Sequence, residues 1–209
     1  MQKGFLTWLM IICVLVLVGS PAQAGKGPFY FGLQGGVTYV QDLDEDLPNK
    51  VLVDPGLAVS AVAGYTLKNI DRADIRLEGE LAYRYNETDE YQKSDLDGDI
   101  TSVALMFNVA VDFVNKTAFT PYVLGGLGVA NVSFNDFESG GVTILDDDDT
   151  VLAYQLGAGC SFNLTEKLDL DLGYRYFSTA KPEVRDEARE KVKINYQNHA
   201  LMLGLRYSF

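Results

Sequence analysis

The sequence is poor in cysteine, histidine and basic residues. Two cysteines and one histidine among 209 residues exclude a disulfide framework and a cysteine-based metal site. Acidic residues outnumber lysine and arginine by 29 to 17, and the net charge of −12 argues against nucleic-acid binding, because phosphates require basic patches. The glycine-rich run 125–128 lacks the following helix and the basic residue of a phosphate-binding loop, so no cofactor is expected.

Long apolar runs are also scarce, and the only one lies at the start of the chain. Lys3 precedes it, residues 5–18 form it, and Ala22-Gln23-Ala24 follows with the small-x-small pattern of a cleavage site. The run is shorter than the ~20 residues that a spanning helix needs. We therefore predict a cleaved signal peptide over residues 1–24 and a single exported domain over residues 25–209. A domain without a second such run could cross a membrane only with strands.

Eight segments of the exported chain alternate apolar and polar residues with a period of two, which indicates β-strands with two different faces. In the clearest of them, Ile75 and Leu77 alternate with Arg76 and Glu78. Each is close to the ~9–11 residues of a tilted transmembrane strand. In one segment several glycines blur the phase, and either face could point outward. The eight segments are 29–40, 57–67, 74–85, 102–113, 120–134 (the blurred one), 152–162, 168–177 and 199–209.

The connections between these segments alternate between short and long. The short ones are 68–73, 115–119 and 163–167, and the long polar ones are 41–56, 86–99, 135–150 and 178–197. Short periplasmic turns and longer outer loops are typical of outer-membrane barrels. We therefore predict an all-β fold, an eight-stranded antiparallel transmembrane β-barrel with short periplasmic turns and four long extracellular loops.

The alternation alone does not say which face is wet, since a soluble barrel would carry its apolar residues inside. Mid-strand charges of both signs, a glycine- and alanine-rich polar face and aromatic residues near strand ends favour the membrane arrangement. The inward charges could either line an ion path or pair with one another in the core. We favour the paired core, because eight strands enclose only their own side chains and an unpaired buried charge is costly. The predicted inward charges are Arg76, Glu78, Glu80, Arg84, Asp112, Asp169, Asp171, Arg175 and Arg206.

Several motifs resemble those of opacity-like and outer membrane protein A-like β-barrels. They are LEGELAYR at 77–84, TPYV at 120–123, LDLDLGYRY at 168–176 and LGLRY at 203–207. The resemblance implies a location in the outer membrane of a Gram-negative bacterium, among lipid and lipopolysaccharide. It also implies that the closing residues are the signal read by the outer-membrane insertion machinery. Those residues are Leu201, Leu203, Leu205, Tyr207 and Phe209. Members of this group are often labelled porin-like, and their roles include adhesion, serum resistance and envelope integrity, so the fold alone decides little about activity.

The acidic loops are candidate sites for divalent cations, which prefer oxygen ligands and could bridge to lipopolysaccharide phosphates. Residues 146–149 are four consecutive aspartates, and residues 42–46 carry four more carboxylates. Solvated loops are the simpler interpretation. Residues 95–99 resemble part of a calcium loop, but Lys93 and Ala104 stand where ligands are needed, so we expect a turn leading into a strand and no metal.

An enzymatic role is tested by the single histidine, His199. Small outer-membrane barrels that deacylate lipid A use a histidine followed two residues later by serine, and this position is Leu201. We therefore expect a non-enzymatic surface protein whose loops serve envelope integrity, adhesion or contact with host or envelope partners. The alternative is a narrow channel for small solutes or ions. The last loop is the leading candidate for partner contact, with a short helical turn expected at 183–192 after Pro182.

Overall fold

The computed structural model describes residues 27–41, 55–68, 73–88, 96–139, 142–180, 183–185, 191–193 and 196–209. The predicted signal peptide lies outside these residues, as does the acidic segment 42–46. The strands are β1 (Phe29–Gln41), β2 (Gly56–Lys68), β3 (Ala73–Thr88), β4 (Leu96–Phe113), β5 (Phe119–Ser139), β6 (Val142–Asn163), β7 (Leu168–Thr179), β8 (Glu183–Arg185), β9 (Lys191–Lys193) and β10 (Gln197–Ser208).

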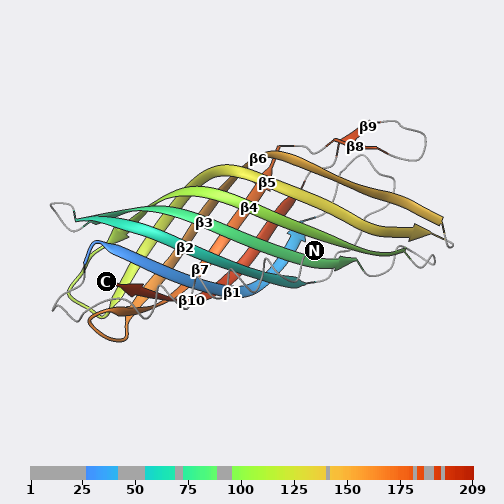
Figure 1. The fold of residues 1–209 in the computed structure, drawn as a ribbon. Coiled ribbons are helices and arrows are strands. Elements are labelled where there is room, and N and C mark those ends of the chain that lie inside the picture. Colours follow the sequence, from blue (N-terminus) through green and yellow to red (C-terminus); the bar gives the residue numbers. More distant parts are fainter. Residues whose placement is uncertain are drawn as a thin grey trace.

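Eight of these strands close into an antiparallel barrel in the order β1-β10-β7-β6-β5-β4-β3-β2 (Figure 1). The predicted fold class is therefore confirmed. The stagger of the barrel is found by starting at Ser178 of β7 and following the paired residues from strand to strand around the barrel. This path returns to β7 at Leu168, ten residues earlier. With ~3.3 Å per residue and ~4.7 Å between strands, this stagger over eight strands tilts them by about 40° to the barrel axis.

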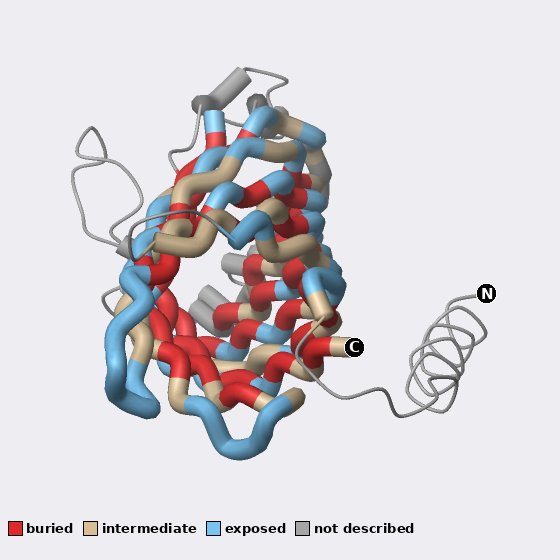
Figure 2. Tube along the Cα trace, turned by 90° about the vertical axis from the view of Figure 1, so that its left-hand side faces the viewer, coloured by how far each residue is buried: buried red, intermediate tan, exposed pale blue. Residues whose placement is uncertain are grey.

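Buried and more exposed residues alternate along most of each barrel strand wherever the structure describes the side chains (Figure 2). The blurred segment 120–134 follows the same rule. Tyr122 and Leu124 on β5 are buried inside, whereas Leu127 is 72 % exposed on the outer wall. Gly125 shares the outer face and Gly126 the inner one, so glycine on both faces had removed the contrast in the sequence.

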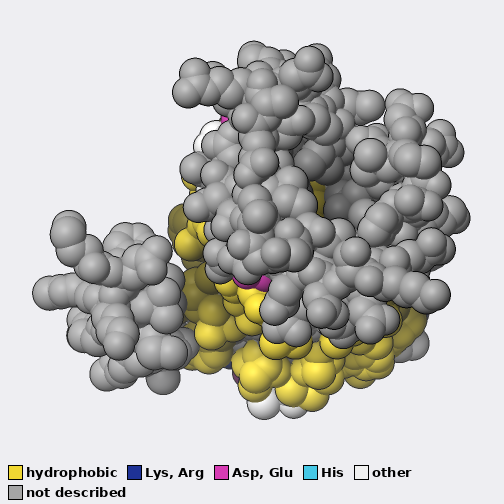
Figure 3. All heavy atoms as spheres, turned by 90° about the vertical axis from the view of Figure 1, so that its right-hand side faces the viewer, with side chains coloured by type: hydrophobic (Ala, Val, Ile, Leu, Met, Phe, Trp, Pro, Cys, Tyr) yellow, Lys and Arg dark blue, Asp and Glu magenta, His cyan; other side chains and the backbone are white. Residues whose placement is uncertain are grey.

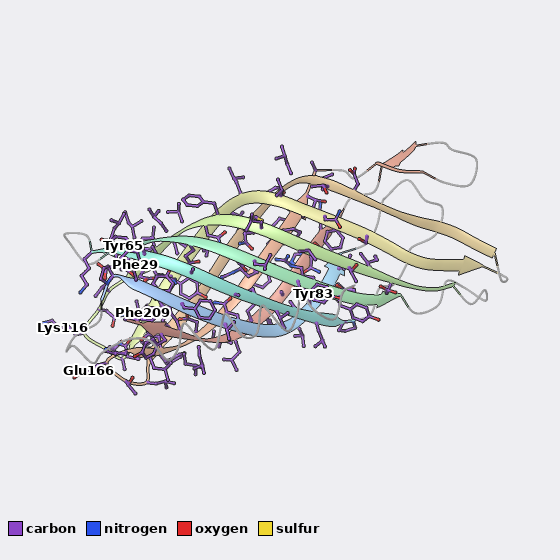
Figure 4. All side chains as sticks on the ribbon, viewed as in Figure 1. Phe29, Tyr65, Tyr83, Lys116, Glu166 and Phe209 are labelled. Carbon is purple, nitrogen blue, oxygen red and sulfur yellow. The ribbon has the colours of Figure 1, made fainter. Side chains whose placement is uncertain are left out.

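The outer wall is apolar. Hydrophobic side chains cover the part of the wall that is visible from the loop end (Figure 3). Phe29, Tyr65 and Phe209 gather at the end that holds the short turns, and Tyr83 lies toward the opposite end (Figure 4). Aromatic residues at both rims match the two headgroup regions of a bilayer. A soluble barrel would place these apolar faces inside, so the alternative is rejected. Among the described residues, no helix is long and apolar enough to cross a membrane.

The chain ends meet at the turn end of the barrel. The amide of Gly27 donates to the carbonyl of Phe209 at 2.7 Å, and the amide of Phe209 donates to the carbonyl of Phe29 at 3.0 Å. The short turn after β4 is held by Asn115, whose side chain accepts from the Thr117 amide at 2.8 Å. Such side-chain bonds replace the lost strand pairing and allow a tight reversal.

Three connections differ from the predictions. Residues 135–150 form a long hairpin and not an irregular loop, because β5 and β6 stay paired as far as Ser139 and Val142. β-Branched residues at 142–144 favour this pairing. Residues 96–99 already belong to β4, opposite the extended β5. The helical turn expected at 183–192 is wrong, because β8 and β9 pair there through Val184 and Val192.

Candidate functional site

The half of the barrel nearest the short turns contains a first group of buried charges, centred on Arg76 of β3. Its Nη1 lies 2.6 Å from Oε1 of Glu78, and its Nε lies 2.9 Å from Oδ2 of Asp112 on β4. The hydroxyl of Tyr30 donates to Glu78 at 2.7 Å. Each charge in this group therefore has a partner of opposite sign, which offsets the cost of removing it from water.

A second group is centred on Arg206 of β10. Its Nε lies 3.1 Å from Asp171, and its Nη2 lies 3.4 Å from Asp169, both on β7. Nη2 also donates to the hydroxyl of Ser161 at 2.9 Å, and that hydroxyl donates to Asp171. One guanidinium thus joins β10, β7 and β6 across the interior.

The middle of the interior is polar as well. Oε2 of Glu80 accepts from Asn108 at 2.7 Å and from Gln155 at 2.6 Å, which links β3, β4 and β6. Arg84 lies 3.9 Å over the ring of Phe177, a cation–π contact. All nine charges expected to point inward are buried inside the barrel, namely Arg76, Glu78, Glu80, Arg84, Asp112, Asp169, Asp171, Arg175 and Arg206.

The half of the interior nearest the loops is closed by an apolar cluster that the sequence analysis did not identify. Phe177 and Tyr196 are its largest members, both fully buried, with their rings 6.2 Å apart and edge-on. The other members are Val40, Ile100, Ala104, Met106, Ala130, Val132 and Ala153. Apolar residues on the inward phase of the predicted strands were the signal that could have revealed the cluster.

An open vestibule of about 180 Å³ lies at the turn end of the barrel. Lys68, Asp74, Asp112, Asp169 and Arg206 contribute its charged lining. Its inner side is formed by carboxylates and an arginine of the two paired groups described above. The vestibule is therefore an open mouth that ends on packed side chains.

The opposite end of the barrel extends into a sheet, here named the outer sheet, made of residues 96–101 of β4, 131–139 of β5 and 142–150 of β6. On β5 the outward face changes from apolar Val129 to polar Asn131, whose side chain donates to Thr150 of β6 at 3.2 Å. This change marks the upper edge of the apolar belt. β5 and β6 contain 21 and 22 residues, about twice the ~9–11 needed to cross a bilayer, and they project past the other strands (Figure 1).

The histidine lies on the outer wall near the loop end. The hydroxyl of Tyr174 is 2.5 Å from Nδ1 of His199, and the ring of Tyr176 lies 5.2 Å from the imidazole. These aromatic contacts place His199 in the rim that borders the apolar belt. Among the described residues, no group of three or more histidine, cysteine or acidic side chains is arranged to hold a metal ion. The side chains of 146–148 are not among the described ones, so neither cation binding nor the simpler interpretation, a solvated acidic run, is tested there.

The closing segment forms β10 and its end. Leu201, Leu203 and Leu205 are exposed on the outer wall, and the ring of Tyr207 packs edge-on against that of Phe209 at 5.5 Å. The five residues expected to form the insertion signal thus share the lipid-facing phase of the last strand. Their recognition by the insertion machinery stays a prediction.

A closed antiparallel barrel with an apolar outer wall and a charged interior is the architecture of an outer-membrane protein. The chain belongs to the family of the outer membrane protein β-barrel domain, whose model matches residues 10–209. It is accordingly a protein of the Gram-negative outer membrane. It is 24 % identical to the outer membrane protein PagN of Salmonella typhimurium, over 95 % of this chain and 98 % of that protein.

Two further likenesses are informative. The chain is 25 % identical to the putative adhesin RC1281 of Rickettsia conorii, over 78 % of this chain and 71 % of the relative. The crystal structure of neisserial surface protein A superposes with a TM-score of 0.58 at 20 % identity, covering 89 % of this chain and all of that one. At this identity the structural likeness concerns the fold alone.

Proposed function

We propose that this chain is a non-enzymatic surface protein, in which a packed barrel holds the outer sheet and its neighbouring loops for contact with an external partner. The observation that carries the proposal is the length of β5 and β6, which continue as paired strands beyond Val129 and Leu152, the last lipid-facing apolar residues among the side chains that the structure describes. Ten further residues on each strand reach about 33 Å at ~3.3 Å per residue. Long paired strands outside the bilayer present a defined surface with little conformational entropy to lose on binding.

The relatives support a role in adhesion. One of them is named a putative adhesin, and it matches most of this chain. Host-surface molecules are therefore the first class of partner to test, and envelope partners the second. A catalytic role receives no support from His199, because its described ring contacts are the tyrosines Tyr174 and Tyr176.

The experiment shortens the outer sheet without touching the barrel. Ser133 and Asp148 are directly paired, so residues 134–147 can be replaced by Asn-Gly, which favours a two-residue hairpin turn. Bacteria that display this variant should adhere to a host-cell monolayer at least tenfold less than bacteria displaying the parent chain. The heat-dependent shift of the barrel on a detergent gel should be unchanged, which shows that the variant still folds.

Two comparison variants locate the contact. Replacing the four aspartates 146–149 by asparagine keeps the hairpin length and tests its charge. Deleting 181–195 tests the last loop, the contact surface that the sequence analysis favoured. Full adhesion by the shortened variant, with loss only on deletion of 181–195, would refute the outer sheet as the contact surface.

The second candidate function is a narrow channel. The vestibule is the observation that favours it, since it gives solutes access to the barrel from the turn end. A continuous path would also have to pass Arg76, Glu78 and the cluster around Phe177, all of which are buried. We therefore rank the channel below the surface protein.

A further inference from the structure

Two arginines in the interior differ from the paired ones. Arg84 and Arg175 are 4 % and 5 % exposed. Among the described residues, no hydrogen-bond acceptor lies within reach of Nη1 of Arg84, or of Nε and Nη1 of Arg175. Arg84 lies over the face of Phe177, and Arg175 lies over the ring of Tyr122 and shares a side-chain hydrogen bond with it. Glu80 is near enough to act electrostatically on both arginines. Ring faces attract a cation but leave the in-plane N–H groups of the guanidinium unsatisfied.

Both arginines line the same small cavity of about 10 Å³. Ser60 and Glu80 supply its other polar groups, and the Ser60 hydroxyl also has no partner among the described residues. The rest of the lining is Ala58, Val59, Ala82, Tyr83, Ala200 and Met202. The alanines leave space in this wall because their side chains end at Cβ. A volume of this size is about that of one water molecule or a similarly small ion.

The charges that line the cavity are unequal, although the nine buried charges of the barrel together are four arginines and five carboxylates. Two guanidiniums face one carboxylate, Glu80, whose Oε2 is already engaged by Asn108 and Gln155. The other buried carboxylates pair with Arg76 and Arg206. Arginine does not lose its proton in proteins, so the excess charge cannot be removed by titration. An uncompensated buried charge is strongly destabilising, whereas a counter-ion at the cavity satisfies both the charge and the free N–H groups.

We propose that this cavity is a binding site for one monatomic monovalent anion, chloride in the natural setting, held by Arg84, Arg175 and the hydroxyl of Ser60. The anion accepts hydrogen bonds from the N–H groups that the aromatic rings leave free, and the hydroxyl of Ser60 donates a further hydrogen bond to it. It offsets the local excess of positive charge at Arg84 and Arg175, between the polar middle of the barrel and the apolar cluster. The site is independent of the proposed surface function.

The test measures thermal unfolding of the folded chain in detergent micelles at constant ionic strength, in sodium chloride or bromide and in sodium methanesulfonate, whose anion is too large for the cavity. Halide should raise the unfolding midpoint saturably, by about 5–10 °C at a hundredfold excess over the dissociation constant. Ser60→Ala should weaken the halide effect, and Arg175→Gln should abolish it. Arg206→Gln, in the other charge group, should be less stable but keep the halide effect.

Crystals soaked in bromide give a second readout that does not depend on variants folding. An anomalous peak between the two guanidiniums is the expected result. Midpoints that are equal in halide and methanesulfonate, or bromide-soaked crystals with no anomalous signal in the cavity, would show that the site holds only water and would overturn the proposal.

Discussion

Single side chains inside this barrel are stabilised by partners on other strands. Arg206 of β10 is held by Asp169 and Asp171 of β7, and through Ser161 it also reaches β6. Such contacts join strands far apart in the sequence. The individual residues could be predicted from the sequence, because a charge in the middle of an alternating strand must face the interior. Their pairing could not, because it depends on the ten-residue stagger of the barrel.

Replacing Arg206 by methionine should lower the free energy of unfolding by about 3–5 kcal/mol, because it leaves two carboxylates buried without their cation. Urea unfolding of the protein refolded in lipid vesicles measures the change. Lys116→Met in the exposed turn is the matched control and should stay within about 0.5 kcal/mol of the parent. A loss below 1 kcal/mol for Arg206→Met would mean that water from the vestibule already solvates these carboxylates.

At the level of whole strands, the sequence pattern predicted the segments whose outer face contacts lipid. It missed the parts of the strands on which lipid places no requirement. Seven segments showed their outward phase because lipid requires apolar residues there. Beyond Val129 the outward residues Asn131 and Ser133 face water, so the alternation ends although β5 continues. The inward cluster around Ile100 was missed for the opposite reason, since apolar residues there occupy the face that was expected to be polar.

The two faces of β5 predict opposite responses to the same substitution. A Cβ added at Gly128 would meet the carbonyl oxygen of Leu105 at 2.1 Å, whereas at Gly125 its nearest neighbour is the flexible end of Leu156 at 3.8 Å. Gly128→Ala should therefore destabilise the barrel by about 1–3 kcal/mol, and Gly125→Ala should be neutral or slightly stabilising. Equal urea midpoints for the two variants would contradict the phase assigned to β5.

The whole molecule is a packed scaffold in which polar pairs fill one half of the barrel, an apolar cluster closes the other, and the outer sheet rises from one side. The barrel and its location could be predicted from periodicity, turn lengths and the closing residues. The outer sheet could not be predicted, because its strands pair beyond the lipid-facing belt, where no alternation of apolar and polar residues is required.

The most direct test of this account is the conductance of the purified chain in planar lipid bilayers. A barrel closed by paired charges and by the cluster around Phe177 should give a current that does not differ from that of the protein-free bilayer. Discrete conductance steps that change when Arg76 or Glu80 is neutralised would contradict the account and establish the charged interior as an ion path.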